Sequence, residues 1–258
     1  MNGLALCAGI GGIELGLRRC VKEYATICYV ERDAYAASVL VKNMQTQTLD
    51  EAPIWDDVAT FDGNKWRGIV DCITAGFPCQ PFSLAGKRQG LTDERWIWPD
   101  IARIIGEIEP PIVFLENVPG FVSMGLQSVL GDLASLGYDA KWCCITAESC
   151  GAPHERERFF LLANTTSDRR EPWREGNREE REKWREFNRS SLHEPISHSD
   201  SKQMGWIAES WSKCDFWAVE PNVGRVANGI RYRVDRLRCL GNAVVPAQAE
   251  LAWRILTS

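Results

Sequence analysis

Strand-like apolar runs alternate with helix-like segments over the first 163 residues, and this alternation restricts the possible folds more than any other feature of the sequence. Strands that alternate with helices form βαβ units, and near-continuous apolar strands are typical of a parallel sheet buried on both faces. The sequence therefore predicts an α/β fold, with a Rossmann-like, mostly parallel sheet and helices on both faces. We expect strands at 3–8, 25–31, 69–76, 111–118 and 158–163, and helices at 12–21, 34–44, 100–108, 126–136 and 246–256.

Composition excludes several classes of protein. The hydrophobic content of 45% and the charged content of 25% are ordinary for a soluble globular chain. The start has no basic region and Glu14 interrupts its apolar stretch, so we expect no signal peptide, and no run is long enough to cross a bilayer. The ten cysteines form no CxxC pair, and the three histidines lie away from paired cysteines. We therefore expect a cytoplasmic monomer with reduced thiols, no metal and no membrane contact.

A glycine-rich turn, "CAGIGGIEL", follows the first expected strand. Gly9, Gly11 and Gly12 allow a ligand to approach the backbone, and the next helix offers its N-terminal amides. Glu31 ends the second strand, where a carboxylate can bind ribose hydroxyls. A dinucleotide fingerprint would have glycine at position 14, and this chain does not. Together with Asp57, the pattern predicts a site for one adenosine-containing cofactor.

Cys79 stands in the Pro-flanked stretch "GFPCQPFS", directly after an expected strand. A thiol at the carboxyl end of a parallel strand can act as a nucleophile, although most free cysteines are small buried hydrophobes. Glu116 ends the strand in "LENV" and so lies on the same edge of the sheet. Alone it would be read as a helix cap or an ion-pair partner. Beside Cys79 it becomes a candidate to hydrogen-bond or protonate a heteroaromatic base.

The segment "HERERFFLLA" has period two. If it is extended, His154, Arg156 and Arg158 share one face, and two arginines there suit a carbonyl or phosphate oxygen. A salt-bridged start to the strand explains the same pattern equally well.

Seven motifs follow one another as "CAGIGG", "VER", "WDDV", "GFPCQPFS", "ENV", "RER" and "LGNAVVP". In this order they resemble the DNA cytosine-5 methyltransferase family of bacterial or phage type. The resemblance implies methyl transfer from S-adenosylmethionine to C5 of a cytosine in duplex DNA, with S-adenosylhomocysteine as product and the base flipped out of the helix. It implies a role in restriction-modification or in phage or host DNA protection, and it leaves room for a cognate restriction endonuclease as partner.

The resemblance also implies the roles of individual residues. The Cys79 thiolate would add to C6 of the cytosine, Glu116 would engage N3, and Arg158 would bind O2 with Arg156 beside it. Gln80 and Ser83 would contact DNA. The cofactor would be held by a larger set, namely Cys7, Ala8, Gly9, Ile10, Gly11, Gly12, Glu31, Arg32, Asp57, Val58, Gly76, Pro78, Asn242 and Val244. Within that set Glu31 would bind ribose, Asp57 and Val58 would bracket adenine, and the last expected helix would pack beside the first strand.

The composition of the sequence changes after residue 163, and residues 167–190 carry eight basic and seven acidic side chains. We therefore expect a cofactor-binding and catalytic domain at 1–163, a short target-recognition region or partly ordered insert at 164–224, and a segment at 225–258 that returns to the catalytic domain. Arg225 and Arg231 precede the last motif, and we expect them to face DNA.

Three other functions compete with this interpretation. An RNA cytosine-5 methyltransferase would use the same catalytic residues. A catalytically weak DNA-binding module of the same fold would be expected to have lost one of them, and none is lost. Thiol redox chemistry would need a resolving cysteine near Cys79, and Cys72 lies at the other end of a strand.

Overall fold

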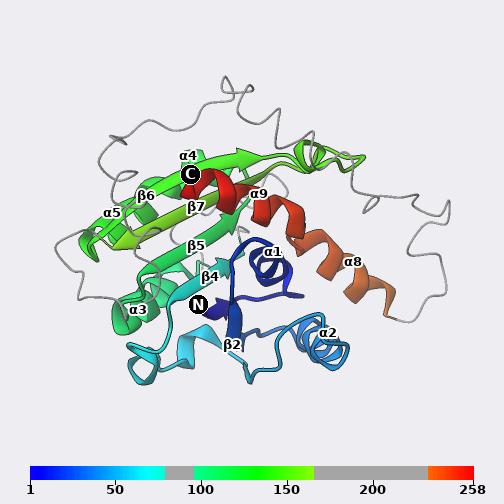
Figure 1. Cartoon of the computed structure of the whole chain (residues 1–258), viewed down its shortest axis with the longest axis horizontal. Helices are drawn as coiled ribbons and strands as arrows, with labels where there is room; N and C mark the ends of the chain where they lie inside the picture. Colours follow the sequence, from blue (N-terminus) through cyan, green and yellow to red (C-terminus); the bar gives the residue numbers. More distant parts are fainter. Residues whose placement is uncertain (79–95, 166–231) are drawn as a thin grey trace.

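A seven-stranded sheet forms the centre of the computed structural model, which describes residues 1–78, 96–165 and 232–258 (Figure 1). The strand order is β3-β2-β1-β4-β5-β7-β6, with the first five strands parallel and β7 antiparallel to both β5 and β6. The predicted mostly parallel sheet is confirmed. The strands are β1 (Asn2–Leu6), β2 (Ala25–Val30), β3 (Ile54–Trp55), β4 (Cys72–Gly76), β5 (Ile112–Asn117), β6 (Tyr138–Ile145) and β7 (Arg158–Thr165).

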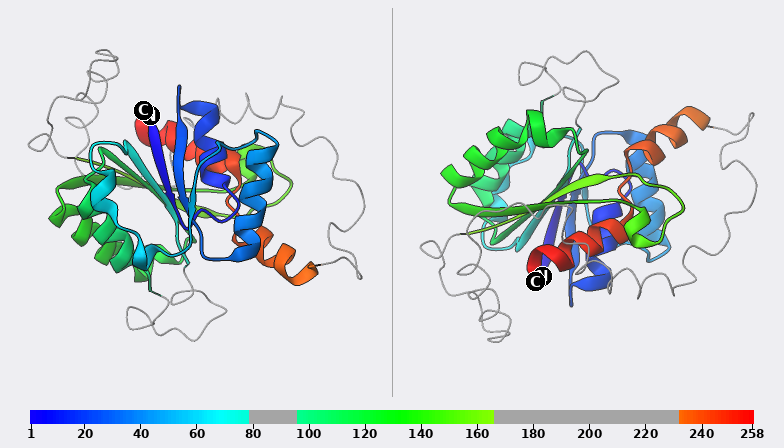
Figure 2. Two further views of the ribbon diagram at one scale, coloured as in Figure 1. Left: turned by 90° about the horizontal axis from the view of Figure 1, so that it is seen from below. Right: turned by 90° about the horizontal axis from the view of Figure 1, so that it is seen from above.

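Helices cover both faces of the sheet (Figure 2). One face carries α3 and α5, and the other carries α1, α2 and α9. The predicted helices are all present. The bounds of the helices in the described residues are α1 (Gly12–Cys20), α2 (Ala34–Gln45), α3 (Trp98–Ile108), α4 (Phe121–Met124), α5 (Leu126–Ser135), α8 (Arg233–Asn242) and α9 (Pro246–Thr257), with short 3₁₀ turns η1 (Val58–Thr60), η2 (Gly63–Trp66) and η4 (Glu148–Cys150).

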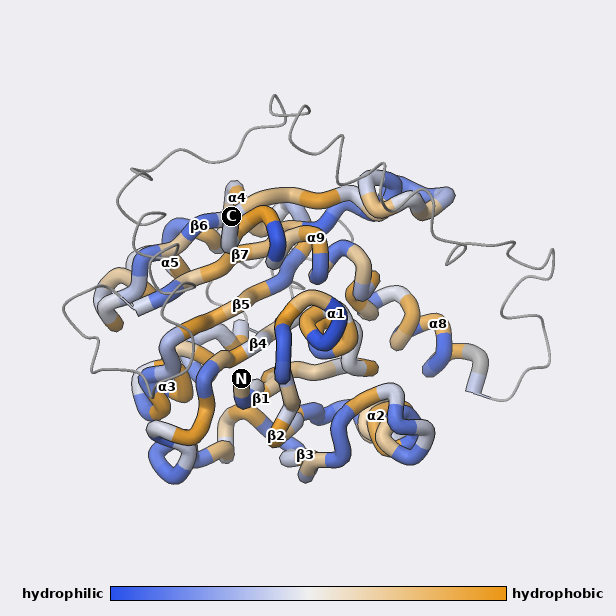
Figure 3. The backbone as a smooth tube through the Cα atoms, viewed as in Figure 1, coloured by the Kyte–Doolittle hydropathy of each residue, from blue (hydrophilic) through white to orange (hydrophobic). Residues whose placement is uncertain are grey.

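Alternate residues of each strand enter different cores. Leu4 and Leu6 of β1 belong to the core under α3 and α5, together with Ile101 and Val129. Ala5, between them in sequence, packs with Leu40 of α2 on the opposite face. This period of two follows from strand geometry, and apolar residues accordingly run along β5 and β7 in Figure 3. The sheet is therefore buried on both sides, as the apolar strands predict.

The segment before β7 is not extended, which corrects the period-two interpretation of "HERER". The strand begins only at Arg158, and Arg156 has a positive φ of 32°. His154, Arg156 and Arg158 therefore do not share one strand face.

Helix α9 returns the end of the chain to its beginning. It packs against α1 and against β6 and β7, and so lies on the helix that follows the first strand rather than beside that strand itself. Gly16 of α1 permits the close approach, because a Cβ there would lie 2.5 Å from the carbonyl oxygen of Pro246 and 2.8 Å from Cβ of Ala249. The contact holds the "GNAVV" segment near the glycine-rich turn.

The order of the strands reverses between β1 and β4. From β1 the chain proceeds outward through β2 and β3, and it then returns to place β4 and β5 on the other side of β1. In open α/β sheets, ligands bind at the carboxyl ends of the strands at such a switch point. The turns after β1 and β4, which contain the glycine-rich motif and the approach to Cys79, border this point.

Candidate active site

The turn between β1 and α1 presents its backbone to open space. Gly9 has φ of 57°, and an added Cβ there would meet no atom within 4 Å. Packing therefore does not explain the glycine. Its positive φ does, and the open space above it leaves room for a ligand to approach the main chain. Gly11, the N-cap of α1 with φ of 85°, is instead required by packing, because a Cβ would collide with Leu49. The turn meets two demands for a cofactor cradle, a tight bend and an uncovered main chain.

Glu31 joins this turn to the start of α2. Its Oε2 accepts a hydrogen bond from the amide of Gly9 at 2.7 Å, and its Oε1 accepts one from the amide of Asp33 at 2.7 Å. Burial raises the pKa of Glu31, against the effect of those amides. Each carboxylate oxygen retains a second lone pair, so the group can still accept hydrogen bonds from ribose hydroxyls.

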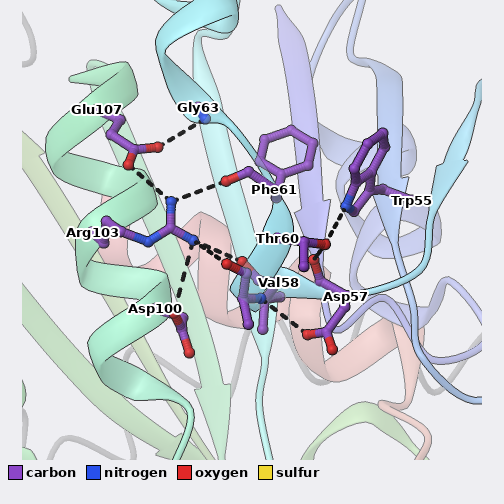
Figure 4. A network of polar contacts seen from close by, with 10 residues as sticks. Trp55, Asp57, Val58, Thr60, Phe61, Gly63, Asp100, Arg103 and Glu107 are labelled. Carbon is purple, nitrogen blue, oxygen red and sulfur yellow. Dashed lines mark hydrogen bonds and ion pairs between the residues drawn. The ribbon is translucent and has the colours of Figure 1, made fainter.

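Asp57 and Val58 follow β3, the strand beside β2 in the sheet. Asp57 caps η1 by accepting a hydrogen bond from the amide of Ala59 at 3.0 Å, and Val58 is buried. Arg32 is largely exposed, and its Nε lies 3.9 Å from Oδ2 of Asp57. Figure 4 shows the polar contacts around this turn. These residues share the β2–β3 side of the switch point with Glu31.

Val244 lies between the two turns that border the switch point. A Cβ on Gly12 would collide with the carbonyl of Val244, and a Cβ on Gly76 would lie 3.9 Å from its Cγ2. Asn242 is exposed at the end of α8. Arg238 of the same helix pairs with Asp33 at the start of α2, with 2.6 Å between Nη2 and Oδ2. Residues more than 200 positions apart thus meet at one site.

A buried carboxyl group lies beside β4. Glu116 of β5 is paired with Gly76, the residue that ends β4, and its Oε1 lies 3.1 Å from Nε of Arg158. Only 8% of its side chain is exposed. Burial raises the pKa of Glu116 to about 7, while the charges of Arg158 and Arg156 lower it. A carboxyl group of this kind can hold or release a proton near neutrality.

Arg156 and Arg158 point to different partners. Nη2 of Arg156 donates to the carbonyl oxygens of Gly241 at 2.8 Å and Ala243 at 2.5 Å, in the "GNAVV" segment. Burial lowers the pKa of Arg156, and the nearby charge of Arg158 acts in the same direction. Arg158 therefore contacts the buried carboxylate of Glu116, and Arg156 contacts the segment that carries Val244.

The sequence did not predict the hydrogen bonds of two further side chains at the site. Asn117 donates from Nδ2 to the carbonyl oxygen of Phe77 at 3.3 Å and accepts from the amide of Val118 at 2.9 Å. Gln248 of α9 donates to the carbonyl oxygens of Ile145 and Arg156, both at 2.7 Å. The position of Asn117 in the "ENV" motif was the available signal. Gln248 lies on an otherwise apolar helix face, which gives no such signal.

Five of the expected site residues lie outside the described residues, namely Cys79, Gln80, Ser83, Arg225 and Arg231. Pro78, the last position described before that gap, is exposed, and Cys7 lies partly buried at the start of the glycine-rich turn with Ala8 and Ile10. Within 1–78, 96–165 and 232–258, no group of three or more His, Cys, Asp or Glu side chains is arranged to hold a metal ion. In the same ranges, no helix has the length and apolar character needed to span a membrane.

Comparison with known proteins identifies a family. Residues 1–217 match the model of the C-5 cytosine-specific DNA methylase family, so the match runs well into the stretch 164–224, in which the sequence contains no recognisable motif. The chain is 38% identical over 162 residues to the type II methyltransferase M.CviJI of a Paramecium bursaria Chlorella virus, covering 62% of this chain and 42% of that protein. It is 36% identical over 162 residues to the type II methyltransferase M.HhaI of Haemophilus parahaemolyticus, covering 61% and 47%.

These alignments span less than half the length of the two relatives. Among solved structures, a mutant of Spodoptera frugiperda DNMT2 superimposes with a TM-score of 0.63 at 16% identity, over 100% of this chain and 99% of that one. At that identity the likeness concerns the fold, which is the fold of S-adenosylmethionine-dependent methyltransferases.

Proposed function

The chain belongs to the C-5 cytosine-specific DNA methylase family, and we propose that it transfers the methyl group of S-adenosylmethionine to C5 of cytosine in duplex DNA. The observation that carries the proposal is the buried pair of Glu116 and Arg158, next to the strand that leads to Cys79. A protonated carboxyl group and a guanidinium, 3.1 Å apart, match the adjacent N3 and O2 atoms on one edge of cytosine.

The proposed chemistry begins with Cys79. Its thiolate forms a bond to C6, and the electron pair of the C5–C6 double bond moves toward C5 and the ring. N3 takes a proton from the carboxyl group of Glu116, and Arg158 donates a hydrogen bond to O2. With its pKa raised to about 7, Glu116 carries that proton in a large fraction of molecules at neutral pH. C5 thereby becomes nucleophilic.

S-adenosylmethionine, when bound, supplies an electrophilic methyl group on a sulfonium sulfur. The chain would hold its methionine side with residues 7–12, its ribose with Glu31 and its adenine with Asp57 and Val58. Val244, Asn242, Gly76 and Pro78 would close the site, and Arg32 would lie at its rim. Support for the fit comes from the open space at Gly9 and the free lone pairs of Glu31.

After transfer, a water molecule or hydroxide takes the proton from C5, and the bond between C6 and Cys79 breaks with its electron pair returning to sulfur. N3 gives its proton back to the Glu116 carboxylate. The C5–C6 double bond reforms, 5-methylcytosine leaves and the thiolate is restored. We further propose that Gln80, Ser83, Arg225 and Arg231 contact the DNA, that residues 164–224 serve target recognition and that the biological role is DNA modification, with a cognate restriction endonuclease as a partner.

The test is incorporation of labelled methyl groups into a duplex DNA library, with an RNA of the same sequences as a parallel arm. We expect incorporation into DNA, at cytosine C5 by bisulfite sequencing, and a loss of about 1,000-fold or more in Cys79→Ser, because a hydroxyl is a far weaker nucleophile at neutral pH. Binding of S-adenosylhomocysteine to Cys79→Ser should match that of the unaltered protein. Wild-type-like activity of the variant would remove Cys79 from the mechanism, and incorporation into RNA alone would replace the proposed substrate.

A second experiment tests the covalent step. Duplex DNA that carries 5-fluorocytosine at the target should give a complex stable to denaturant, because fluorine cannot leave C5 as the proton does. The control is Cys79→Ser, which should give no such complex. A gel without a shifted species, under conditions in which ordinary cytosine is methylated, would contradict the adduct.

A further inference from the structure

Arg103 of α3 contacts the main chain of the turn that contains Asp57 and Val58. Its Nη2 donates to the carbonyl oxygens of Val58 at 2.8 Å and Ala59 at 3.3 Å, and its Nη1 donates to the carbonyl oxygen of Phe61 at 2.9 Å. Figure 4 shows the guanidinium between α3 and this turn. One side chain thus satisfies three carbonyl groups within four residues.

Glu107, one helical turn further along α3, completes the arrangement. Its Oε1 accepts from Nη1 of Arg103 at 2.8 Å, and its Oε2 accepts from the amide of Gly63 at 2.8 Å. We call Arg103 and Glu107 the α3 clamp. The clamp fixes the chain at both ends of the stretch 58–63, one end through carbonyl groups and the other through an amide.

Regular secondary structure gives the turn little support. Strand β3, which leads into it, has only two residues, and η1 has three. Within the turn, the amides of Ala59 and Thr60 bond to Asp57, and Phe61 packs on Trp66. These hydrogen bonds and the ring contact are local, whereas the buried side chains of Val58 and Phe61 join the core under α3 and α5. Side-chain packing thus holds the turn on the sheet, but it does not fix the orientation of the carbonyl groups of the turn. The α3 clamp supplies contacts to another element, across more than 40 residues of sequence.

We propose that Arg103 is a positioning residue for the adenosine half of the cofactor site. The inference rests on the proposed function, which assigns Asp57 and Val58 to the adenine. Arg103 does not reach that ligand itself; it holds the backbone that presents Asp57 and Val58. An arginine is suited to this because its planar guanidinium offers five donors in a fixed geometry, whereas lysine offers a compact charge with three.

The variant Arg103→Lys retains the charge and the length but cannot reach three carbonyl groups at once. We expect about tenfold weaker binding of S-adenosylhomocysteine by calorimetry and a similar weakening for adenosine alone, because both ligands contain the adenine. KM for S-adenosylmethionine should rise by the same factor, while kcat at saturating cofactor stays within about twofold. Glu107→Gln keeps one acceptor oxygen and replaces the other with an NH2 donor, so it loses one of the two bonds and should weaken binding by a smaller factor.

Arg67→Lys is the matched control. Arg67 also donates to carbonyl groups of α3, from Nε to Glu107 at 2.9 Å and from Nη2 to Gly106 at 3.3 Å, but no hydrogen bond or ion pair joins it to 57–61 in the described residues. Its Kd should equal that of the unaltered protein. If Arg103 has a purely structural role, Arg103→Lys should lower the melting temperature. Its Kd, measured well below that temperature, should then stay within twofold of the Kd of the unaltered protein, and that result would overturn the proposal.

The outcomes separate this inference from the proposed function. If the unaltered protein binds S-adenosylhomocysteine but methylates no DNA, the function fails, while the Kd of Arg103→Lys still decides the inference. If Arg103→Lys does not fold, the Kd of Glu107→Gln decides it, with a value equal to that of Arg67→Lys counting against the clamp.

Discussion

Glu14 is a carboxylate held away from water. It lies in the first turn of α1, is 1% exposed, and its Oε1 accepts a hydrogen bond from Oγ1 of Thr74 at 2.6 Å. Its Oε2 has no hydrogen-bond partner within the described residues. Burial raises the pKa of Glu14 to about 7, and the bond from Thr74 only partly opposes this. Ionisation of Glu14 therefore costs stability.

The first prediction concerns stability against pH. Because the folded pKa of about 7 lies above the unfolded value near 4.5, the native state binds the proton more tightly, and stability falls as pH rises from about 4.5 through 7. Between pH 5 and 8 the unaltered protein should lose about 2 kcal/mol of unfolding free energy relative to Glu14→Gln, by urea denaturation at each pH. Glu51 is exposed, so Glu51→Gln serves as the control. Its unfolding free energy should change with pH in parallel with that of the unaltered protein. Parallel curves for Glu14→Gln as well would mean that Glu14 does not titrate in this range.

Glu116 gives the second prediction, on activity. Its carboxyl group must be protonated to act on N3, so the contribution of Glu116 to kcat/KM for DNA should fall as pH rises above about 7. Glu116→Gln should lower single-turnover methyl transfer by about 100-fold or more and lose the alkaline decline. Retention of that decline in the variant would assign it to another group.

The helices that face the sheet are readily predictable, since their apolar residues recur at helical spacing and glycine or proline marks several of their ends. The edge of the sheet is not. Strand β6 contains Asp139 and Lys141 among its apolar residues, and its partner β7 runs antiparallel, which no local pattern specifies. Helix α8 is also hard to predict from the sequence. Its apolar residues Val234, Leu237 and Leu240 are exposed, so they form no buried stripe.

The contact between α1 and α9 gives the third prediction. Gly16→Ala places a methyl group 2.5 Å from the carbonyl oxygen of Pro246 and 2.8 Å from Cβ of Ala249. Because neither neighbour is the end of a flexible side chain, the clash can be relieved only by moving one of the helices. We expect a loss of about 1–3 kcal/mol in unfolding free energy, by urea denaturation. The control is Gly131→Ala in α5, where nothing lies within 4 Å of the added Cβ. That substitution should raise stability by up to about 1 kcal/mol, because alanine favours the helix. Equal effects at the two sites would show that α1 and α9 are not in close contact.

At the scale of the molecule, the site combines segments whose roles differ in how visible they are in the sequence. Glycine-rich turns and strand-end carboxylates are visible, because their chemistry requires particular residue types at particular positions. The acceptors of Arg103 and Arg156 are main-chain carbonyl groups, which every residue possesses, so no sequence pattern reveals them. Arg156 contacts the "GNAVV" segment and has a φ of 32°, which no local sequence pattern specifies.

The fourth prediction follows from this construction. S-adenosylhomocysteine should slow hydrogen exchange at residues 8–12 and 241–245 together, because Val244 packs on Gly12 and both border the proposed site. Peptides from α5, which lies on the other face of the sheet, should exchange at unchanged rates. Mass spectrometry of the exchanged protein reads both regions in one experiment. Protection of 8–12 alone would exclude the "GNAVV" segment from the site.

The packing of α9 on α1 also has a consequence for synthesis on the ribosome. Helix α1 is translated long before α9, so its Gly16 face lacks this partner until the chain has been extended through residues 246–257. A nascent chain can form the βαβ units early, but it must keep that apolar face uncovered for most of the translation time. Such long-range contacts slow folding, and the exposed face is a natural binding surface for a chaperone in the interval. Competence to bind the cofactor should therefore arise late, only after the segment containing Val244 and α9 has emerged from the exit tunnel.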